Sequence, residues 1–374
     1  MENNFRKIIN SSNRIVLKVG SSILMNQNSG EININWLTSF ANDLLKMLNK
    51  NKKLLVVSSG SIALGRKQLK LKDNLSLDEK QAAAAVGQIN LSHAWKEVLK
   101  SFNINSAQIL LAPDDTETRR KHINARATLE KLLHLKVIPV INENDTVSTQ
   151  EIKYGDNDRL ASRVAQISGA DCLILLSDVD GLYSKNPKIH KNAKLIKEIK
   201  NIDSKIENFS SKSTSEYGTG GMKTKIDAAK VCQVSGCYMA IANGLIKRPI
   251  KNILEHNSGT WFLPKVSKLD ARKKWIISSI SPKGEIIIDD GALNALKNGK
   301  SLLAAGIRKV SGKFVKGDHV RILDKNNKEF ARGLSSFTSD EISKIKGEHS
   351  NKISNLLGYV TKSEVIHKDD MVKI

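Results

Sequence analysis

The chain has 374 residues, 40% of them hydrophobic, and carries a formal net charge of +22. This length and composition predict a globular protein with a large buried core and two or three domains. No stretch of eighteen apolar residues occurs, and the N-terminus lacks the pattern of a secretory signal, so we expect a cytoplasmic protein without a membrane span.

Strand-type and helix-type segments alternate over the first 243 residues. Runs of β-branched and aliphatic residues predict strands, and apolar residues at helical spacing predict helices. Such alternation predicts an α/β fold, a three-layer sandwich with a mainly parallel central sheet and helices on both faces. The predicted strands are 14–20, 53–60, 107–112, 136–142, 172–177 and 237–243, and the predicted helices are 35–50, one after Gly60, 77–102, 122–135, 157–168 and 222–235.

The C-terminal part has a different pattern. Segment 306–322 alternates polar and apolar residues between Gly turns, which is typical of a small β-barrel. A Lys-rich stretch separates this part from the α/β region. We therefore expect a second, β-rich unit at the C-terminus.

The loops that follow the predicted strands are the place to look for a ligand. In a parallel sheet, ligands bind in the crevice beyond the carboxyl ends of the strands. Four of these loops contain unusual polar residues or glycines, and a fifth segment opens a helix. These segments are 18–22, 58–65, 141–158, 177–183 and 218–225.

Segment 218–225, GTGGMKTK, has the features of a phosphate site. Its glycines let the backbone turn N–H groups towards an anion, and the helix that begins near Met222 adds its positive end. Lys223 and Lys225 supply cations, and Lys18 at the end of the first strand supplies another. A glycine-rich turn before a helix is, on its own, more often a plain turn. Together with the acidic loop, these features indicate phosphoryl transfer without a P-loop.

The loop 141–158 collects acids and amides, although the chain as a whole is strongly basic. Two interpretations are open. Either the residues hold a substrate and orient the lysines, or they cap the helix that begins near Asp158 through Asx turns and an N-cap. For Glu151 and Asp156 the capping interpretation has equal weight.

The basic charge invites a nucleic-acid interpretation, but its distribution argues against a dedicated groove. From Trp275 onwards, 17 Lys and Arg stand against 12 Asp and Glu, and the lysines of the chain are scattered. Only 13 of the 60 cations are Arg, the residue that contacts phosphates and bases bidentately. A generally Lys-rich surface is the simpler explanation.

The three cysteines are predicted to be core residues. Cys172, Cys232 and Cys237 form no CxxC motif and have no His at ligand spacing. They lie in apolar strand or helix patterns, where buried free thiols are common, so we do not expect them to bind a metal.

Several motifs, taken in order, resemble those of the amino-acid kinase family. They are VLKVGSS, VSSG, INEND with GDND, SDVDGLY and GTGGMKTK. The combination of NEND, GDND and GTGGM is the most specific part, and within the family it resembles the glutamate 5-kinases. The C-terminal part is similar to a PUA domain, a small β-barrel that many bacterial members carry. The resemblance implies a kinase domain at 1–264, a linker at 265–274 and a PUA domain at 275–374.

The resemblance also implies roles for individual residues. Lys18 and Lys225 match the two catalytic lysines, and Asp158 matches the acid that orients them. No metal site in the protein is implied, because Mg²⁺ arrives on the phosphates of ATP. The positions matched to ATP binding are Lys18, Ser177, Asp178, Thr219, Gly220, Gly221, Met222, Lys223, Thr224 and Lys225.

The implied reaction transfers the γ-phosphoryl group of ATP to the side-chain carboxylate of L-glutamate, the first step of proline biosynthesis. A carboxylate is already ionised at pH 7 and needs no general base, which fits the absence of a convincing catalytic His. Ser59, Asp145 and Asn157 match positions that bind glutamate, and Asp145 suits its α-ammonium group. The family also implies feedback inhibition by proline, which shares the α-ammonium and α-carboxylate groups.

Further partners follow from the same resemblance. We expect a homo-oligomer, either a dimer or a tetramer, and transient contact with a separate glutamyl phosphate reductase that receives the labile acyl phosphate. Two alternatives stay open: a related kinase for another acidic metabolite, and an RNA-binding protein led by the PUA domain. Within the kinase interpretation, a structural or regulatory PUA domain is favoured over one that binds RNA.

Overall fold

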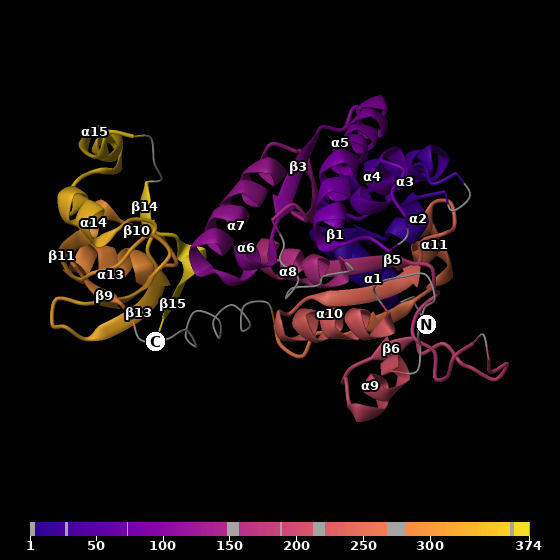
Figure 1. The fold of residues 1–374 in the computed structure, drawn as a ribbon. Coiled ribbons are helices and arrows are strands. Elements are labelled where there is room, and N and C mark those ends of the chain that lie inside the picture. Colours follow the sequence, from indigo (N-terminus) through magenta and orange to yellow (C-terminus); the bar gives the residue numbers. More distant parts are fainter. Residues whose placement is uncertain are drawn as a thin grey trace. The chain divides into compact units, whose positions relative to one another are not determined.

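The chain folds into two compact units, Met1–Lys268 and Leu269–Ile374, each with its own hydrophobic core (Figure 1). The predicted linker at 265–274 lies mostly outside the described residues, so its extent stays a prediction. The computed structural model describes residues 4–26, 29–72, 74–147, 157–187, 189–211, 221–267, 282–359 and 363–373.

The first unit is built on an eight-stranded sheet in the order β3-β4-β2-β1-β5-β7-β8-β6. The six predicted strands all occur and run parallel to one another, which confirms the mainly parallel sheet. Two short strands were not predicted: β8 pairs antiparallel with β7, and β6 pairs with β8. The strands are β1 Arg14–Val19, β2 Lys53–Ser58, β3 Ser106–Leu111, β4 Ile138–Glu143, β5 Cys172–Ser177, β6 Glu198–Ile199, β7 Tyr238–Asn243 and β8 Thr260–Phe262.

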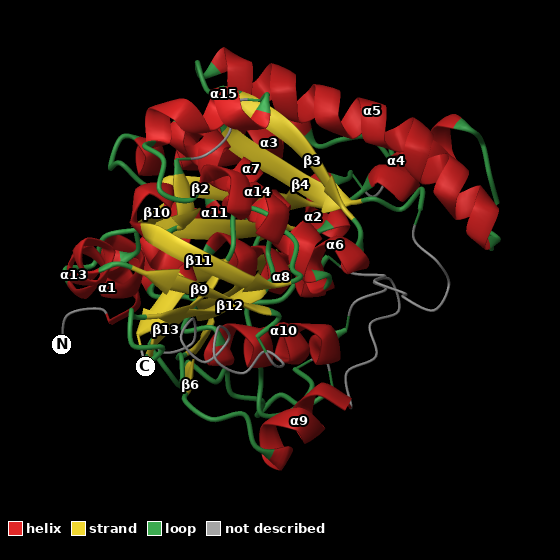
Figure 2. Ribbon diagram, turned by 90° about the vertical axis from the view of Figure 1, so that its left-hand side faces the viewer, coloured by secondary structure: helices red, strands yellow, loops and turns green. Residues whose placement is uncertain are grey.

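Helices cover both faces of this sheet, and Figure 2 shows α5 above the strands and α10 below them. One core lies under α1, α3, α5 and α11, and the other lies under α7, α8 and α10. Among the described residues, no helix is both long and apolar enough to cross a bilayer. The helices are α1 Asn4–Ser11, α2 Ser21–Leu24, α3 Ile34–Leu48, α4 Ser61–Gln68, α5 Leu77–Ser101, α6 Pro113–Glu117, α7 Arg119–His134, α8 Asp158–Ser168, α9 Ser204–Ser211, α10 Met222–Val234 and α11 Pro249–His256.

The second unit is rich in strands, as its period-two pattern predicts. It has a five-stranded sheet in the order β11-β9-β12-β13-β15 and a two-stranded sheet of β10 and β14. A separate apolar core lies between these sheets and three short helices. The elements are β9 Gly284–Ile288, α13 Asp290–Lys297, β10 Leu302–Leu303, β11 Ile307–Gly312, β12 His319–Leu323, β13 Glu329–Leu334, α14 Ser339–Ile345, α15 Ile353–Leu357, β14 Glu364–Ile366 and β15 Met371–Lys373.

The register of the first sheet brings the polar loops to one edge. Val19 in β1 pairs with Ser58 in β2 and with Leu176 in β5, and Val57 in β2 pairs with Ile141 in β4. The carboxyl ends of these four neighbouring strands therefore lie at the same level. The loops that follow them are the ones in which the sequence predicts a ligand site.

The three predicted cysteine positions are confirmed as core. Cys172 begins β5, Cys232 lies in α10, and Cys237 precedes β7. All three are free thiols and at most 1% exposed. Burial raises the pKa of the Cys172 thiol well above its usual value, so it is unreactive at neutral pH.

Two glycines let α4 and α5 approach until their backbones touch. A Cβ on Gly87 in α5 would lie 1.9 Å from the carbonyl oxygen of Ser61, and one on Gly65 in α4 would lie 1.8 Å from that of Ala83. The atoms in contact belong to the backbone, so an added methyl group could be accommodated only if one of the helices moved. This contact fixes the start of α4 against the middle of α5.

We expect Gly87→Ala to destabilise the protein by about 1–3 kcal/mol or more, because its methyl group overlaps backbone atoms. In an open helix, the same change would stabilise by about 0.5–1 kcal/mol. Gly291→Ala in α13 is the matched control, since a Cβ there meets only Asp289 Oδ1 at 3.4 Å. Thermal unfolding followed by circular dichroism compares the two, and equal melting temperatures would contradict the close contact.

Candidate active site

The centre of the site is the carboxylate of Asp158, the first residue of α8, which is fully buried. Lys18 Nζ lies 2.7 Å from its Oδ1, and Lys225 Nζ lies 2.9 Å from its Oδ2. The two lysine side chains are only 5% and 7% exposed. Two ammonium groups thus share one buried carboxylate. The residues come from β1, α8 and α10, so packing of three elements brings them together.

Strand alternation explains the direction of the Lys18 side chain. Leu17 and Val19 belong to the core under α3 and α5, whereas Val16 belongs to the core under α8 and α10. Because side chains alternate along a strand, Lys18 points to the same side as Val16, towards α8 and α10. A buried charge without a partner would cost several kcal/mol, so Asp158 is a necessary counterion. The N-terminal turn of α8 further stabilises its negative charge.

The described part of the predicted phosphate segment is the start of α10. Met222 is its first residue, and Gly221 precedes it as the N-cap with φ −73° and ψ −177°. Gly221 has no side chain to cap the helix, and Thr224 Oγ1 donates to the Gly221 carbonyl oxygen at 2.8 Å. Lys223 is exposed, whereas Lys225 is turned inward. The first N–H groups of α10 are thus suited to an anion. The predicted residues Thr219 and Gly220 lie outside the described residues.

Ser177 and Asp178 lie at the end of β5 on the same edge. Ser177 Oγ donates to Asp178 Oδ1 at 3.1 Å; Ser177 is nearly buried and Asp178 is exposed. Two residues further on, Asp180 Oδ1 accepts from Asn243 Nδ2 at 2.9 Å. This bond ties the loop after β5 to the end of β7. Sequence reasoning missed Asn243, although its position at the end of a parallel strand was a usable signal.

A chain of buried amides runs along the edge between β2 and β4. Asn157 Nδ2 donates to the Ser58 carbonyl oxygen at 2.6 Å and to Asn142 Oδ1 at 2.7 Å. Asn142 Nδ2 donates to Gln88 Oε1 at 2.7 Å and to Ser61 Oγ at 3.3 Å. Asn157 makes no side-chain cap on α8, so the capping interpretation is wrong for this residue. Its amide instead joins α8 to the sheet. Glu151 and Asp156 lie outside the described residues.

Asp145 lies next to this chain, because Ser61 Oγ donates to its Oδ2 at 3.3 Å. Burial disfavours the charged form and raises the pKa of Asp145 to about 6, although the Ser61 hydrogen bond opposes the shift. Among the contacts of Asp145 there is no basic side chain in the described part of the chain. A carboxylate in such surroundings gains strongly from a ligand cation.

The predicted residue Ser59 lies in the turn between β2 and α4, where its N–H donates to the Val19 carbonyl oxygen at 3.2 Å. It is half-buried beside Ser58, whose hydroxyl accepts from Trp95 Nε1 at 2.9 Å. Sequence reasoning missed three members of this network, Ser61, Gln88 and Asn142. Asn142 stands inside the acidic motif and Ser61 inside the glycine turn, but no local pattern distinguishes Gln88 within its long helix.

Comparison with known proteins agrees with this geometry. The sequence model of the amino acid kinase family matches residues 13–243, and that of the PUA domain matches residues 284–357. Carbamate kinase from Giardia lamblia bound to AMP-PNP is 15% identical with a TM-score of 0.50, covering 68% of this chain and 100% of that one, and shares the fold. Fold, site and family match together define the class: an amino acid kinase with an appended PUA domain.

Relatives that align over nearly their whole length show which group of amino acid kinases this chain resembles. Glutamate 5-kinase of Pelagibacter ubique (strain HTCC1062) is 64% identical over 367 residues, which is 98% of this chain and 100% of the relative. Glutamate 5-kinase of Rhodopseudomonas palustris (strain BisB5) is 48% identical over 360 residues, 96% of each chain. The chain belongs to the glutamate 5-kinases of the amino acid kinase family.

The raised pKa of Asp145 makes a prediction about stability. The folded protein binds the carboxyl proton of Asp145 more tightly than the unfolded chain does. The contribution of this group to the free energy of unfolding is therefore fully present below pH 4 and is lost as pH rises through about 6. Above pH 6 the ionised carboxylate costs at most about 3 kcal/mol. We expect Asp145→Asn to be more stable than the wild type at pH 7 and to lose this advantage towards pH 4.

Urea unfolding at several pH values between 4 and 7 measures this difference. Asp114→Asn is the control, because the Asp114 carboxylate is exposed and bonded to Lys121, which holds its pKa below the usual value. A constant difference between wild type and Asp145→Asn over the whole pH range would contradict the raised pKa.

Proposed function

We propose that this chain transfers the γ-phosphoryl group of ATP to the side-chain carboxylate of L-glutamate and so forms L-glutamyl 5-phosphate, the first step of proline biosynthesis. The observation that carries the proposal is the buried arrangement of Lys18 and Lys225 on the two oxygens of Asp158, at the edge where the strands end. The family membership, at 64% identity over nearly the whole chain, supports the choice of substrate.

The chemistry needs charge neutralisation more than bond activation. An oxygen of the substrate carboxylate attacks the γ-phosphorus, the bond from that phosphorus to the β,γ-bridging oxygen breaks, and ADP leaves. The nucleophile is already ionised, so no base is required. The main obstacle is repulsion between the carboxylate and the triphosphate. Lys18 and Lys225 offset it with their ammonium groups, and Asp158 holds both groups in place.

The nucleotide is assigned to the edge formed by β5 and α10. Ser177 ends β5 and Asp178 follows it, and the described positions from Gly221 to Lys225 form the start of α10, whose first N–H groups suit a phosphate. Thr219 and Gly220 are assigned to the same nucleotide site. Mg²⁺ enters on the phosphates of ATP, where it neutralises part of their charge. The described residues contain no group of three or more His, Cys, Asp or Glu that could cage a metal, and Asp158 is engaged by both lysines.

The amino acid end of glutamate is assigned to Ser59, Asp145 and Asn157. Both N–H bonds of the Asn157 amide are used within the protein, so its Oδ1 is left as an acceptor for the α-ammonium group. Asp145 adds a carboxylate whose burial favours a cationic partner. Ser59 supplies a hydroxyl beside them. Proline carries the same α-groups, so we assign its inhibitory binding to these residues.

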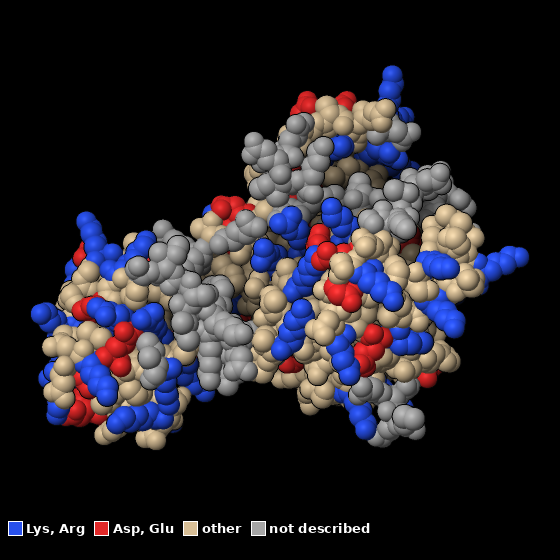
Figure 3. All heavy atoms as spheres, turned by 90° about the horizontal axis from the view of Figure 1, so that it is seen from below, with Lys and Arg blue, Asp and Glu red and all other residues tan. Residues whose placement is uncertain are grey.

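The acyl phosphate product hydrolyses readily and must be reduced soon after release, so transient contact with glutamyl phosphate reductase is part of the proposal. A dimer or tetramer is proposed for the assembly. The PUA domain is assigned a structural or regulatory role. On the face shown in Figure 3, Lys and Arg of both units are interspersed with Asp and Glu, which gives no support to an RNA groove there.

The first test is ATP- and Mg²⁺-dependent formation of glutamyl hydroxamate from L-glutamate with hydroxylamine as the trap. We expect Lys18→Met to lower kcat at least about 100-fold, because one of two charges that offset the phosphoryl oxygens is removed. Lys46→Met on the exposed side of α3 is the control and is expected to keep full activity. If hydroxamate forms only from another carboxylate, the kinase activity stands and the assignment of glutamate as the substrate is wrong. No product from any carboxylate would overturn the kinase assignment.

The second test uses the pKa of Asp145. Only the ionised carboxylate attracts the α-ammonium group, so we expect KM for glutamate and the inhibition constant of proline to rise together as pH falls below about 6. KM for ATP is expected to stay nearly constant over this range. N-acetylglutamate, which lacks the ammonium group, is expected to be a poor substrate at every pH. A flat KM for glutamate between pH 5 and 7 would exclude Asp145 from substrate binding.

A further inference from the structure

The amide chain beside the proposed substrate site has a fixed direction. It starts at the Ser58 carbonyl oxygen, a backbone acceptor at the end of β2 that cannot change its role. Asn157 Nδ2 must therefore face that oxygen, and the same nitrogen donates to Asn142 Oδ1. This direction makes Asn157 Oδ1, and not its nitrogen, the atom that is left for the substrate.

The direction holds only if Asn142 keeps its oxygen towards Asn157. An amide rotated by half a turn would place the Asn142 nitrogen against the Asn157 nitrogen, and two donors would face each other. Asn142 is only 3% exposed, so water has little access to repair such a fault. With its oxygen turned to Asn157, Asn142 needs an acceptor for its own nitrogen at the other end of the amide chain.

Gln88 is the stronger of these partners. Its Oε1 accepts from Asn142 Nδ2 at 2.7 Å, whereas Ser61 Oγ lies at 3.3 Å. The Ser61 hydroxyl donates its one proton to Asp145, so it too can only accept from Asn142, but over the longer distance. Gln88 presents its oxygen to Asn142, which supplies the acceptor that the direction set at Ser58 requires at this end. The bond thereby holds Asn142 in the orientation that leaves an acceptor at Asn157.

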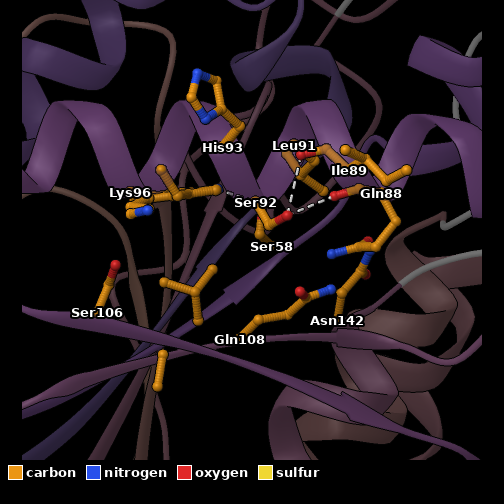
Figure 4. Close-up of a pocket in the computed structure, with 13 residues that line it drawn as sticks. Ser58, Gln88, Ile89, Leu91, Ser92, His93, Lys96, Ser106, Gln108 and Asn142 are labelled. Carbon is orange, nitrogen blue, oxygen red and sulfur yellow. Dashed lines mark hydrogen bonds between the residues drawn. The ribbon is translucent and has the colours of Figure 1, made fainter.

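The surroundings of Gln88 show how it is held. Its neighbour Gly87 contacts the Ser61 backbone, and this contact fixes the turn of α5 that carries Gln88 beside the chain of hydrogen-bonded amides. On its other side lies a pocket of about 320 Å³ between α5 and the strands β3 and β4, where Figure 4 shows Gln88 beside Asn142 and Gln108. Packing alone therefore does not enclose the Gln88 side chain, and its hydrogen bond to Asn142 orients it.

We propose that Gln88 is a positioning residue for the α-ammonium group of the substrate, acting through Asn142 and Asn157. The proposal rests on the glutamate kinase function given above. Gln88 contacts no phosphate-binding residue among those described, so its effect falls on binding of the amino acid and not on phosphoryl transfer.

The test compares Gln88→Leu, which removes the acceptor at similar volume, with Gln88→Glu, which keeps it. We expect Gln88→Leu to raise KM for glutamate about tenfold or more, with kcat and KM for ATP within about twofold of wild type. Gln88→Glu is expected to have a KM for glutamate close to that of the wild type. Ser92→Ala is the matched control, because Ser92 borders the same pocket one turn along α5 and bonds only to the helix backbone.

The possible outcomes separate this proposal from the proposed function. If the wild type phosphorylates glutamate and Gln88→Leu has an unchanged KM for it, the positioning role fails and the kinase assignment stands. If Gln88→Leu raises KM for glutamate and KM for ATP alike, or if Gln88→Glu does not restore KM for glutamate, the role of Gln88 is structural and the proposal is overturned. A wild type that does not phosphorylate glutamate overturns both.

Discussion

The site depends on one buried carboxylate shared by two lysines. Asp158 holds the ammonium groups of Lys18 and Lys225, which reach it from a central strand and from a distant helix. Without it, the core between the sheet, α8 and α10 would contain two like charges with little access to water, at a cost of several kcal/mol. The same contact that permits these lysines to be buried also holds two ammonium groups at the strand edge. Folding and anion binding thus depend on one residue.

The sequence was sufficient to predict the parts of the site that lie on regular, periodic elements. All six parallel strands were identified from apolar runs, and parallel topology predicted that the loops after β1, β2, β4 and β5 would meet. Lys18 and Asp158 stood at the borders of those loops, so their convergence followed, whereas Lys225 stood at the start of a separate helix and was linked to them by the family resemblance. Two short strands, β6 and β8, were missed because two or three residues carry no measurable period.

Gln88 shows what sequence patterns leave undetermined. It lies in a 25-residue helix with a weak apolar stripe, and nothing nearby marks it as different from other polar residues. Its importance comes from the contact of Gly87 with the backbone of α4, and from the distance of 2.7 Å to Asn142 in β4. Both are contacts between elements far apart in the chain. A one-dimensional pattern predicts which face of a helix is buried, but not which polar group meets another across an interface.

The charges and the direction of the hydrogen bonds make the two ends of the proposed substrate site different. At one end lie the ammonium groups of Lys18 and Lys225. At the other end, Asp145 has a raised pKa, and Asn157 presents an oxygen because the Ser58 backbone and Asn142 take its N–H bonds. A substrate with a carboxylate at one end and an ammonium group at the other is then favoured in one orientation only. A neutral amide nitrogen would gain less from Asp145. In the proposed function, substrate selection therefore follows from an ionised carboxylate that is costly to the free protein, since the ligand supplies a cation where the described residues place none.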